Sequence, residues 1–386
     1  MVNTRYEPTT PIGNDMLRIS LPISPPKNRR GAFHTFAPHP SAKVEFHNLL
    51  RYSTNQQLNK LIFSFCFFLF ALSTANAQVY PVVFYNLENL FDPADDPLTD
   101  DEEFTPNGSY RYTDKIYSQK LRNMAYALQR AGTDKNPNGA ALIGIAEVEN
   151  NKVLNDLVNT QELKARNYKY VWYNSTDPRG IDVALLYNPA VFKVLASKQL
   201  PVRKGAREPL YVKGILAGDT VHVLVNHWPS RREGADETEY KRREMATANR
   251  KMIDEIRRTN RNARILMMGD LNDNPTDVSL TQELGSIADA NAVGNNTMYN
   301  PFTSIYASGR GTAVFQRKWD LFDQVILSAG FVKSKGIQYA GAEIYDRPFL
   351  RQEGGKFRNY PFRSFRGTYW NNGYSDHFPV VVYLKK

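Results

Sequence analysis

The sequence predicts an α/β protein built from layered β-sheets. Short β-rich runs recur along the chain after residue 78, and several are continuously apolar, as expected for strands buried on both faces. Only two convincing helices lie between these runs. Many strands with few helices favour a layered sandwich over a doubly wound sheet. No interdomain linker appears, so residues 78–386 are expected to form a single domain.

The predicted strands are bounded by turn-forming or polar residues and are rich in Val, Ile, Leu and aromatic side chains. In chain order they are VYPVVFY (79–85), ALIGIAEV (141–148), YKYVWY (168–173), DVALLY (182–187), VHVLVNHW (221–228), ARILMMGD (263–270), DQVILS (323–328) and FPVVVYL (378–384).

Two helices are predicted from apolar stripes with helical spacing. The first, 114–131, carries Tyr117, Leu121, Met124 and Leu128 on one face, and Gly132 follows as a C-cap. The second, 236–258, repeats the spacing with Met245, Ala248, Met252 and Ile256.

The segment 60–77 has the pattern of an export signal. Lys60 precedes the apolar run LIFSFCFFLFAL (61–72), and Ala75-Asn76-Ala77 forms a small-residue cleavage site before Gln78. The run is too short to span a bilayer comfortably, so a signal peptide is favoured over a buried helix or an anchor. The chain is therefore expected to be exported, to the periplasm or the medium. Residues 1–59 are too long for a normal n-region and are interpreted as an extension, with the true start near Leu58.

Charge and cysteine content narrow the function classes. The formal charge is +10, but residues 78–386 keep 41 Lys/Arg against 36 Asp/Glu, a net of +5. This mild basic bias is compatible with a polyanionic substrate without demonstrating one. The only cysteine, Cys66, lies inside the apolar run. Disulfides, a thiol nucleophile and a Cys-based zinc site are therefore excluded after residue 77.

Polar clusters follow the apolar strands, where buried strands reach the rim of a sheet. Asn86 follows VVFY, and Glu147 follows LIGIA. A carboxylate directly after a buried strand needs a buried partner or a cation. For Asn86 alone, a simple turn residue is the alternative.

Three later clusters extend the pattern. VNHWPSRR contains His227, which taken alone could be structural, with Arg231 and Arg232. MMGDLNDNP places Asp270 and Asn272 two residues apart. The two side chains either form a simple Asx turn, or act as a pair in which one orients or deprotonates water and the other donates a hydrogen bond to a developing oxyanion. Asp376 and His377 precede the last strand and must face different partners, and Asp323 is a further strand-end carboxylate.

The ordered set Asn…Glu…His…Asp-x-Asn…Asp…Ser-Asp-His resembles the signature of the endonuclease/exonuclease/phosphatase (DNase I-like) superfamily, and it spans residues 81–384. GDLND and SDHFPV are specific in combination, and FYNLENLFD, NHWPSRR and GYSDH resemble a bacterial exported branch. The resemblance implies a four-layered sandwich of two packed β-sheets flanked by helices, with one active site across their rims.

The resemblance also implies roles for these residues in hydrolysing a phosphate ester with activated water. Glu147 would hold a divalent metal, Mg²⁺ or Mn²⁺, with Asn86 and Asp376 close by. Oxygen ligands suit such hard cations better than zinc. His377 would accept the proton of the attacking water or bind the scissile phosphate, supported by Asp323. Asp270 would orient the nucleophile. Asn272 and His227 would donate hydrogen bonds to the transition state, and Asp182 would orient His227.

Further segments bear on ligands and substrate. The acidic stretch 92–103 is either a solvated loop or a structural Ca²⁺ site. The stretch 345–370 interleaves Lys/Arg with aromatics, which suits a phosphate backbone with stacked bases or, equally, an insertion packed on the core. The predicted phosphate contacts are Arg179, Arg231 and Arg232.

Three functions compete at this point. A nuclease is favoured, and a phosphatase or phosphodiesterase for lipid headgroups, inositol phosphates or nucleotides is the second candidate. A binding module that retained the fold and lost catalysis is the third, although every expected polar position is filled. Nucleic acid or another phosphoester is the expected partner, with no stable membrane span and no obligate protein partner indicated.

Overall fold

The computed structural model describes residues 77–386. Its first sheet is built around β1, which pairs with β17 in antiparallel and with β2 in parallel orientation. The strand order is β14 (Gln338–Ile344), β17 (Val380–Lys385), β1 (Val79–Leu90), β2 (Leu142–Val148), β4 (Asp182–Tyr187) and β3 (Lys169–Trp172). The predicted extension 1–59 lies outside the described residues, as does all but the last residue of the predicted signal peptide 60–77.

The second sheet is larger and also mixed, because β7 and β8 are parallel while β6 and β13 run antiparallel beside them. Its order is β5 (Phe192–Gln199), β6 (Leu210–Leu216), β7 (Asp219–His227), β8 (Arg264–Asp270), β13 (Asp323–Ser328), β10 (Met298–Tyr299) and β9 (Ser286–Ile287). Two small ribbons, β11 (Ala313–Phe315) with β12 (Lys318–Asp320) and β15 (Phe365–Arg366) with β16 (Tyr369–Trp370), complete the strands.

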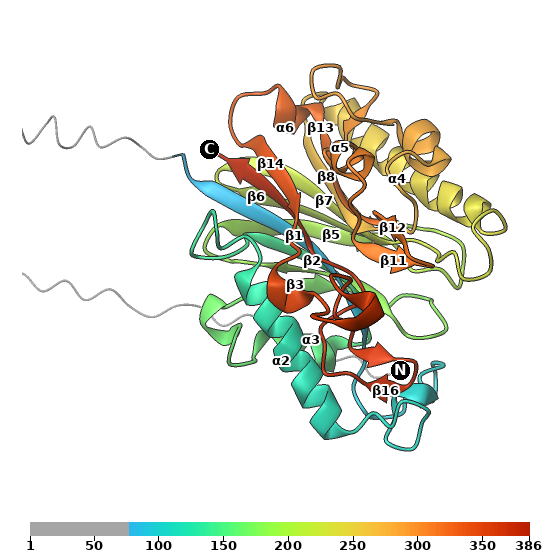
Figure 1. Cartoon of the computed structure of the whole chain (residues 1–386). Coiled ribbons are helices and arrows are strands. Elements are labelled where there is room, and N and C mark those ends of the chain that lie inside the picture. The colour runs from blue at the N-terminus through green and yellow to red at the C-terminus, as the bar shows by residue number, and fades with distance from the viewer. Residues whose placement is uncertain (1–76) are drawn as a thin grey trace, which may run out of the picture. The chain divides into compact units, whose positions relative to one another are not determined.

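The two sheets lie face to face, with helices outside each (Figure 1). α2 (Asp114–Arg130) and α3 (Asn151–Val158) cover the first sheet, and α4 (Glu239–Thr259) covers the second. This is the predicted α/β sandwich with flanking helices. The remaining short turns are α5 (Phe302–Ala307), α6 (Ala329–Val332), η1 (Glu102–Phe104), η2 (Lys164–Arg166), η3 (Ser279–Leu284), η4 (Pro348–Leu350) and η5 (Gly355–Phe357).

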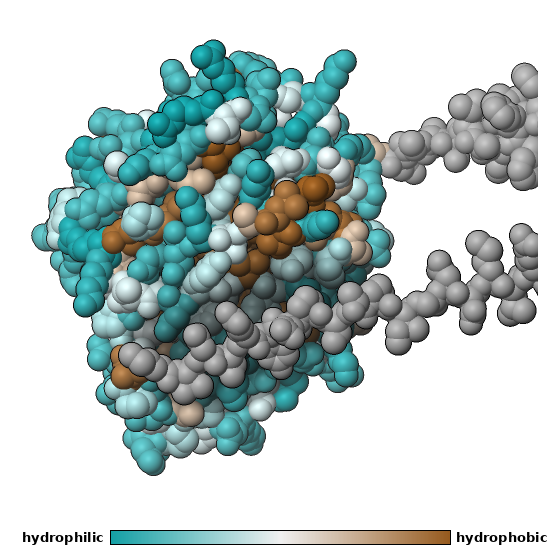
Figure 2. All heavy atoms as spheres, turned by 180° about the vertical axis from the view of Figure 1, so that it is seen from behind, coloured by the Kyte–Doolittle hydropathy of each residue, from teal (hydrophilic) through white to brown (hydrophobic). Residues whose placement is uncertain are grey.

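The apolar faces of the strands generate the core. Phe84 of β1 and Met268 of β8 are fully buried between the sheets, and Ile143 of β2 is fully buried in the same main cluster. A second cluster joins Met245 and Ile253 of α4 to the outer face of the second sheet. On the face seen in Figure 2, hydrophobic residues form separate patches among hydrophilic ones. Among the described residues, no helix has the length and apolar character needed to cross a membrane.

Candidate active site

The ends of β1 and β2 lie together at the rim of the first sheet, because these strands pair in parallel. Asn86 donates from Nδ2 to Glu147 Oε1 at 3.1 Å and to Asp270 Oδ2 at 3.0 Å. The second carboxylate oxygen of Glu147 accepts from the backbone nitrogen of Asn89 at 2.8 Å. Since Asp270 belongs to β8, the Asn86 amide connects the rims of the two sheets.

The register of the second sheet brings its polar residues to the same place. His227 ends β7, Asp270 ends β8 and Asp323 begins β13. His227 and Asp323 are both register partners of Asp270, one on each side. Nε2 of His227 lies 3.7 Å from Asp270 Oδ2 and 3.7 Å from Glu147 Oε1. Five side chains predicted from separate segments therefore share one cluster.

His377 enters this cluster from the loop before β17. Its Nδ1 lies 2.6 Å from Asp323 Oδ2, and its Nε2 lies 3.9 Å from Asp270 Oδ2. Burial alone lowers the pKa of His377, but the attraction of Asp323 and Asp270 outweighs it and raises this pKa well above its usual range. The two carboxylates therefore favour the protonated form of His377.

His227 has the opposite protonation state. Burial lowers its pKa well below the usual range, and the positive charges of Arg207, Arg179 and His377 add to the effect. Its Nδ1 is buried without a hydrogen-bond partner among the described residues. The site therefore combines one neutral and one cationic imidazole, which can perform different tasks at the same pH.

Asp270 is held between these groups. Burial raises its pKa to about 7, opposed by the His377 charge and supported by repulsion from Asp323 and Glu147. Its Oδ1 accepts from the backbone nitrogen of Asn272 at 3.0 Å. The Asn272 side chain donates to the Trp228 carbonyl at 3.0 Å, so one of its two amide protons is already engaged.

Two groups of side chains have ligand atoms within 4.8 Å of one another: Glu147, His227 and Asp270, and Asp270, Asp323 and His377. The first group fits a divalent cation, because it offers two carboxylates and a neutral imidazole. The second fits less well, because a protonated imidazole has no free lone pair for a metal. Asn86 contributes through Nδ2, since its Oδ1 accepts from the backbone nitrogen of Glu88 at 2.9 Å.

Asp376, predicted beside the metal, lies outside both groups. Its Oδ2 accepts from Arg363 Nη2 at 3.1 Å, and 37% of its side chain is exposed. Arg363 also contacts Glu88, with 3.3 Å between Nε and Oε1. The charge of Asp376 is therefore balanced by Arg363 of the 345–370 segment, a pairing that the sequence pattern did not indicate.

The predicted phosphate contacts divide into two kinds. Arg179 and Arg232 are exposed or half-exposed, and Arg232 forms no ion pair within residues 77–386. Arg231, in contrast, donates to the Asn272 carbonyl at 2.6 Å and also binds Asp273 and Asp277. The prediction for Arg231 needs correction, because these contacts make it a brace for the loop after β8.

The structure also gives Asp182 partners other than His227. Its two carboxylate oxygens accept from Trp172 Nε1 and from the backbone nitrogen of Ser175, each at 2.8 Å. Asp182 therefore fixes the loop after β3, and the proposed orientation of His227 is wrong in this respect. The backbone around His227 is held instead by the buried Arg207, which donates to the carbonyls of His227 and Trp228.

Two buried charged residues beside the site escaped the sequence interpretation. Glu88 is 5% exposed and accepts from the backbone nitrogen of Ser364 at 2.6 Å. Burial raises its pKa to about 7, with Asp376 adding and Arg363 and Lys120 opposing. Lys120 is fully buried and donates to the carbonyls of Glu88 and Asn89. Lys120 lies beside the apolar stripe of the first predicted helix, and a lysine at such a position could have indicated a buried charge.

Most aromatic residues of the 345–370 segment pack on the core instead of forming an open surface for bases. Phe365 packs edge-to-face against Tyr110 and Trp370, and Tyr360 packs edge-to-face on Trp319. Phe357 and Tyr369 are its only exposed large hydrophobic residues. In the acidic stretch 92–103, Asp92 and Asp101 are buried and accept backbone hydrogen bonds, so it is not simply a solvated loop.

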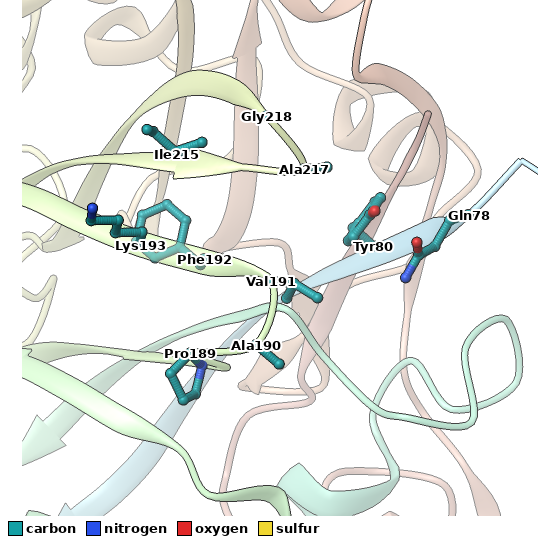
Figure 3. A pocket seen from close by; sticks show the side chains of 10 residues that line it. All are labelled: Gln78, Tyr80, Pro189, Ala190, Val191, Phe192, Lys193, Ile215, Ala217 and Gly218. Carbon is teal, nitrogen blue, oxygen red and sulfur yellow. The ribbon is translucent and has the colours of Figure 1, made fainter. Parts of the chain in front are cut away.

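A surface pocket of about 460 Å³ lies at the other end of β1 (Figure 3). Gln78, Tyr80, Val191 and Ala217 line it, and Lys193 is its one charged residue. The pocket is separate from the polar cluster at Asn86, because five residues of extended strand lie between Tyr80 and Asn86. Its lining offers no group suited to acid–base or metal chemistry.

The chain is similar to several solved structures. A humanised TDP2 of D. rerio carrying 14 mutations is 11% identical, with 80% of this chain and 100% of that chain covered and a TM-score of 0.50. A truncated C. elegans TDP2 is 16% identical, with coverages of 80% and 98% and a TM-score of 0.49. A mannosyl-6-phosphatase of Bacteroides thetaiotaomicron is 16% identical, with coverages of 79% and 99% and a TM-score of 0.48.

No curated protein sequence matches the chain. The sequence model described as the Endonuclease/Exonuclease/phosphatase family matches residues 81–386, which includes every side chain of the cluster. The fold is that of the D. rerio structure, with two mixed sheets packed between helices. The chain therefore belongs to the endonuclease/exonuclease/phosphatase family, a family of phosphoester hydrolases.

Proposed function

We propose that this chain hydrolyses phosphodiester bonds with water, using a divalent cation held at the rim of the two sheets. The single observation that supports this most strongly is the convergence of Glu147, Asp270, His227 and His377 from four separate segments. Such convergence places carboxylates, a neutral imidazole and an imidazolium around one point. These are the groups that hydrolysis of a phosphate ester needs.

Glu147, Asp270 and His227 would hold the cation, and the hard oxygen donors favour Mg²⁺ or Mn²⁺. When bound, the cation supplies positive charge against the negative charge that gathers on the phosphate oxygens. Asn86 keeps both carboxylates in place through its two Nδ2 hydrogen bonds. Loss of Asn86 would therefore misplace two ligands at once.

The remaining side chains suit the reacting groups. Asp270 would orient the attacking water through its carboxylate. The charges of Asp323 and Asp270 favour the protonated form of His377, which suits it to bind the scissile phosphate. Asp323 holds His377 in this charged state. Asn272 retains one amide proton for the transition state, whereas Nε2 of His227 would be occupied by the cation and its Nδ1 is buried.

For the substrate, we propose nucleic acid. Arg179 and Arg232 contribute positive charge near the cluster. The charge of Arg179 helps to lower the pKa of His227. The charge of Arg232 opposes the rise in the pKa of Tyr110 that Glu88 supports. Residues 78–386 also keep a net positive charge of +5. Cations beside the reacting phosphate suit a polymer with several phosphates in a row.

A phosphatase for smaller phosphate esters is the second candidate. It is favoured by the paired arginines of the 345–370 segment. Arg347 pairs with Glu343, Arg351 pairs with Asp346, and Arg363 pairs with Glu88 and Asp376. These arginines are therefore less available to a nucleic-acid backbone than their sequence pattern suggests. The packed aromatic residues between them leave few rings on which bases could stack.

We also propose that the chain is exported, on the strength of the apolar run 61–72 and the Ala75-Asn76-Ala77 pattern. Expression of the full chain in a bacterial host should release a product that begins at Gln78. N-terminal sequencing of the periplasmic or secreted protein checks this expectation. A product that retains residues 60–77 and stays in the cytoplasm would contradict it.

The test of function is an assay of purified 78–386 protein with Mg²⁺, Mn²⁺ or a chelator. Plasmid DNA, RNA, bis-p-nitrophenyl phosphate, p-nitrophenyl phosphate and phospholipids serve as substrates. The proposal predicts metal-dependent cleavage of nucleic acid and of the diester bis-p-nitrophenyl phosphate. Cleavage of the monoester alone would select the phosphatase. No metal-dependent cleavage of any substrate would reject hydrolysis.

A further inference from the structure

A second pocket, of about 520 Å³, lies at the C-terminal end of α4, where the helix meets the loop before β10. Its lining combines three arginines, one aspartate and two asparagines: Arg257, Arg258, Arg261, Asp254, Asn295 and Asn296. None of these residues belongs to the polar cluster. The lining is therefore strongly cationic and has no role in the proposed hydrolysis.

Arg257 gives the pocket a buried charge. The residue is 7% exposed, and its Nη2 donates to the Thr297 carbonyl at 2.8 Å. Its Nη1 is buried without a hydrogen-bond partner among the described residues. Burial lowers the pKa of Arg257 to about 10, and the neighbouring Arg250 contributes in the same direction. A guanidinium in this position is incompletely satisfied, which is costly for a buried ion.

The acidic residue of the pocket does not neutralise this charge. Both carboxylate oxygens of Asp254 are occupied by Arg250, at 3.0 Å from Nε and 2.8 Å from Nη2. Arg258 and Arg261 are exposed and form no ion pair within residues 77–386. Three guanidinium groups therefore face one pocket without a carboxylate of their own.

A purely structural role explains part of this arrangement. Cations near a helix C-terminus interact favourably with the exposed carbonyls of the last turn, and Arg257 fastens the loop through Thr297. It does not explain why three arginines share one concave site with an unpartnered buried nitrogen. The amide side chains of Asn295 and Asn296 add neutral donors at the rim, as anion sites commonly do.

We propose that this pocket binds a multiply charged oxyanion of phosphate type, either free phosphate or the phosphate group of a monoester. Arg258 and Arg261 would donate charge-assisted hydrogen bonds from the rim, and Arg257 would supply fixed charge behind them. The site is separate from the polar cluster. Arg242, near the start of α4, braces Asp273 beside the cluster, and Arg257 lies about 22 Å further along the helix.

The test is calorimetric titration of the 78–386 protein after removal of divalent metal on a chelating resin. Inorganic phosphate and glucose 6-phosphate are titrated separately, at an ionic strength held constant with sodium chloride. The Arg258→Gln/Arg261→Gln variant is compared with Lys251→Gln/Lys115→Gln. The control removes the same charge from exposed positions that form no ion pair within the described chain. Circular dichroism verifies that both variants are folded.

The proposal predicts that the arginine variant binds the better of the two ligands at least about tenfold more weakly than the parent protein. The lysine variant should bind as the parent does. The tighter ligand identifies whether free phosphate or a phosphate ester is preferred. Absence of binding to the parent, equal affinity in the arginine variant, or equal weakening in both variants would overturn the proposal.

Discussion

Asp270 is the residue at which the two sheets and both histidines meet. It accepts from Asn86 of the first sheet and from the Asn272 backbone, and it lies within 4 Å of an imidazole nitrogen of His227 and of His377. A carboxylate shared in this way cannot be replaced by a neighbour. The properties of the site therefore depend on single side chains more than on the surrounding loops.

Loss of a single charged side chain of the cluster should therefore abolish most of the activity. Glu147→Ala, Asp270→Ala and His377→Ala should each lower kcat by about 10²–10³ or more, because the first two remove ligands of the cation and the third removes a cationic contact to the reacting phosphate. Thermal unfolding should stay cooperative in all three. The exposed Glu353→Ala serves as the control with unchanged kcat. Near-parental turnover of bis-p-nitrophenyl phosphate in any of the three would refute the role given to that residue.

At the scale of elements, α2 supports the end of β1 through Lys120. The strand passes through left-handed backbone at Glu88, with φ of 48°, and at Asn89, with φ of 54°. Such backbone in non-glycine residues is strained and persists where the surroundings enforce it. Lys120 donates to the carbonyls of these same two residues. The helix therefore stabilises the turn that positions Asn86 and Asn89.

Lys120→Met should destabilise the protein by about 1–3 kcal/mol, because two carbonyls lose a buried charged donor. It should also reduce activity, since Asn89 no longer holds Glu147 as firmly. Chemical denaturation and the diesterase assay measure the two effects. Lys115→Met, on an exposed position of the same helix, is the matched control and should change neither. Equal stability of the two variants would contradict the account of Lys120.

The pairing of β6 and β7 leads to a pH prediction. His222 of β7 lies 2.7 Å from the hydroxyl of Tyr211 of β6, and burial, with the Lys213 charge, lowers its pKa to about 4. Unfolded His222 binds its proton near pH 6.5, so the unfolded state gains protons first as the pH falls. The titration of His222 therefore leaves the free energy of unfolding unchanged above pH 6.5 and lowers it as the pH falls from 6.5 to 4.

His222→Gln should therefore reduce the loss of unfolding free energy between pH 7 and pH 4.5. Denaturant unfolding of parent and variant at both pH values gives the comparison, which cancels contributions from other titrating groups. The variant should show the smaller loss. An identical pH dependence in the two proteins would mean that His222 titrates alike in the folded and unfolded chain.

Each strand predicted from an apolar run corresponds to a strand of one of the two sheets, and the helices predicted at 114–131 and 236–258 correspond to α2 and α4. The mostly buried β6 was not predicted. β5 was missed because Lys193, Lys198 and other polar residues alternate along an edge strand. α3 was missed because its eight residues are too short to show a periodic stripe.

At the scale of the molecule, the close approach of the two sheets depends on Gly144. A Cβ added to Gly144 of β2 would overlap Met268 of β8 and contact Phe84. Gly144→Ala should therefore cost about 1–3 kcal/mol by overpacking. In the Met268→Ala background the same substitution should cost less, because the side chain that the added Cβ would overlap is gone, and a double-mutant cycle from denaturation would show this. Full stability of Gly144→Ala would contradict the tight packing seen here.

The sequence predicted most of the cluster, because strand ends placed polar residues where sheet rims converge. It could not show that Asp376 pairs with Arg363, or that Arg231 is held by Asp273 and Asp277. These contacts join distant segments and depend on loop conformation. Nor do residue types reveal the left-handed backbone of Glu147, with φ of 61°, which sets the direction of its side chain.

The central claim is that Glu147, Asp270 and His227 together hold a divalent cation. Titration of metal-free 78–386 protein with Mn²⁺, followed by electron paramagnetic resonance of the free ion, measures that directly. The account predicts one tight site in the parent protein and at least about tenfold weaker binding in Glu147→Gln, with Glu353→Gln unchanged. Equal Mn²⁺ binding by all three proteins, or none by the parent, would contradict it.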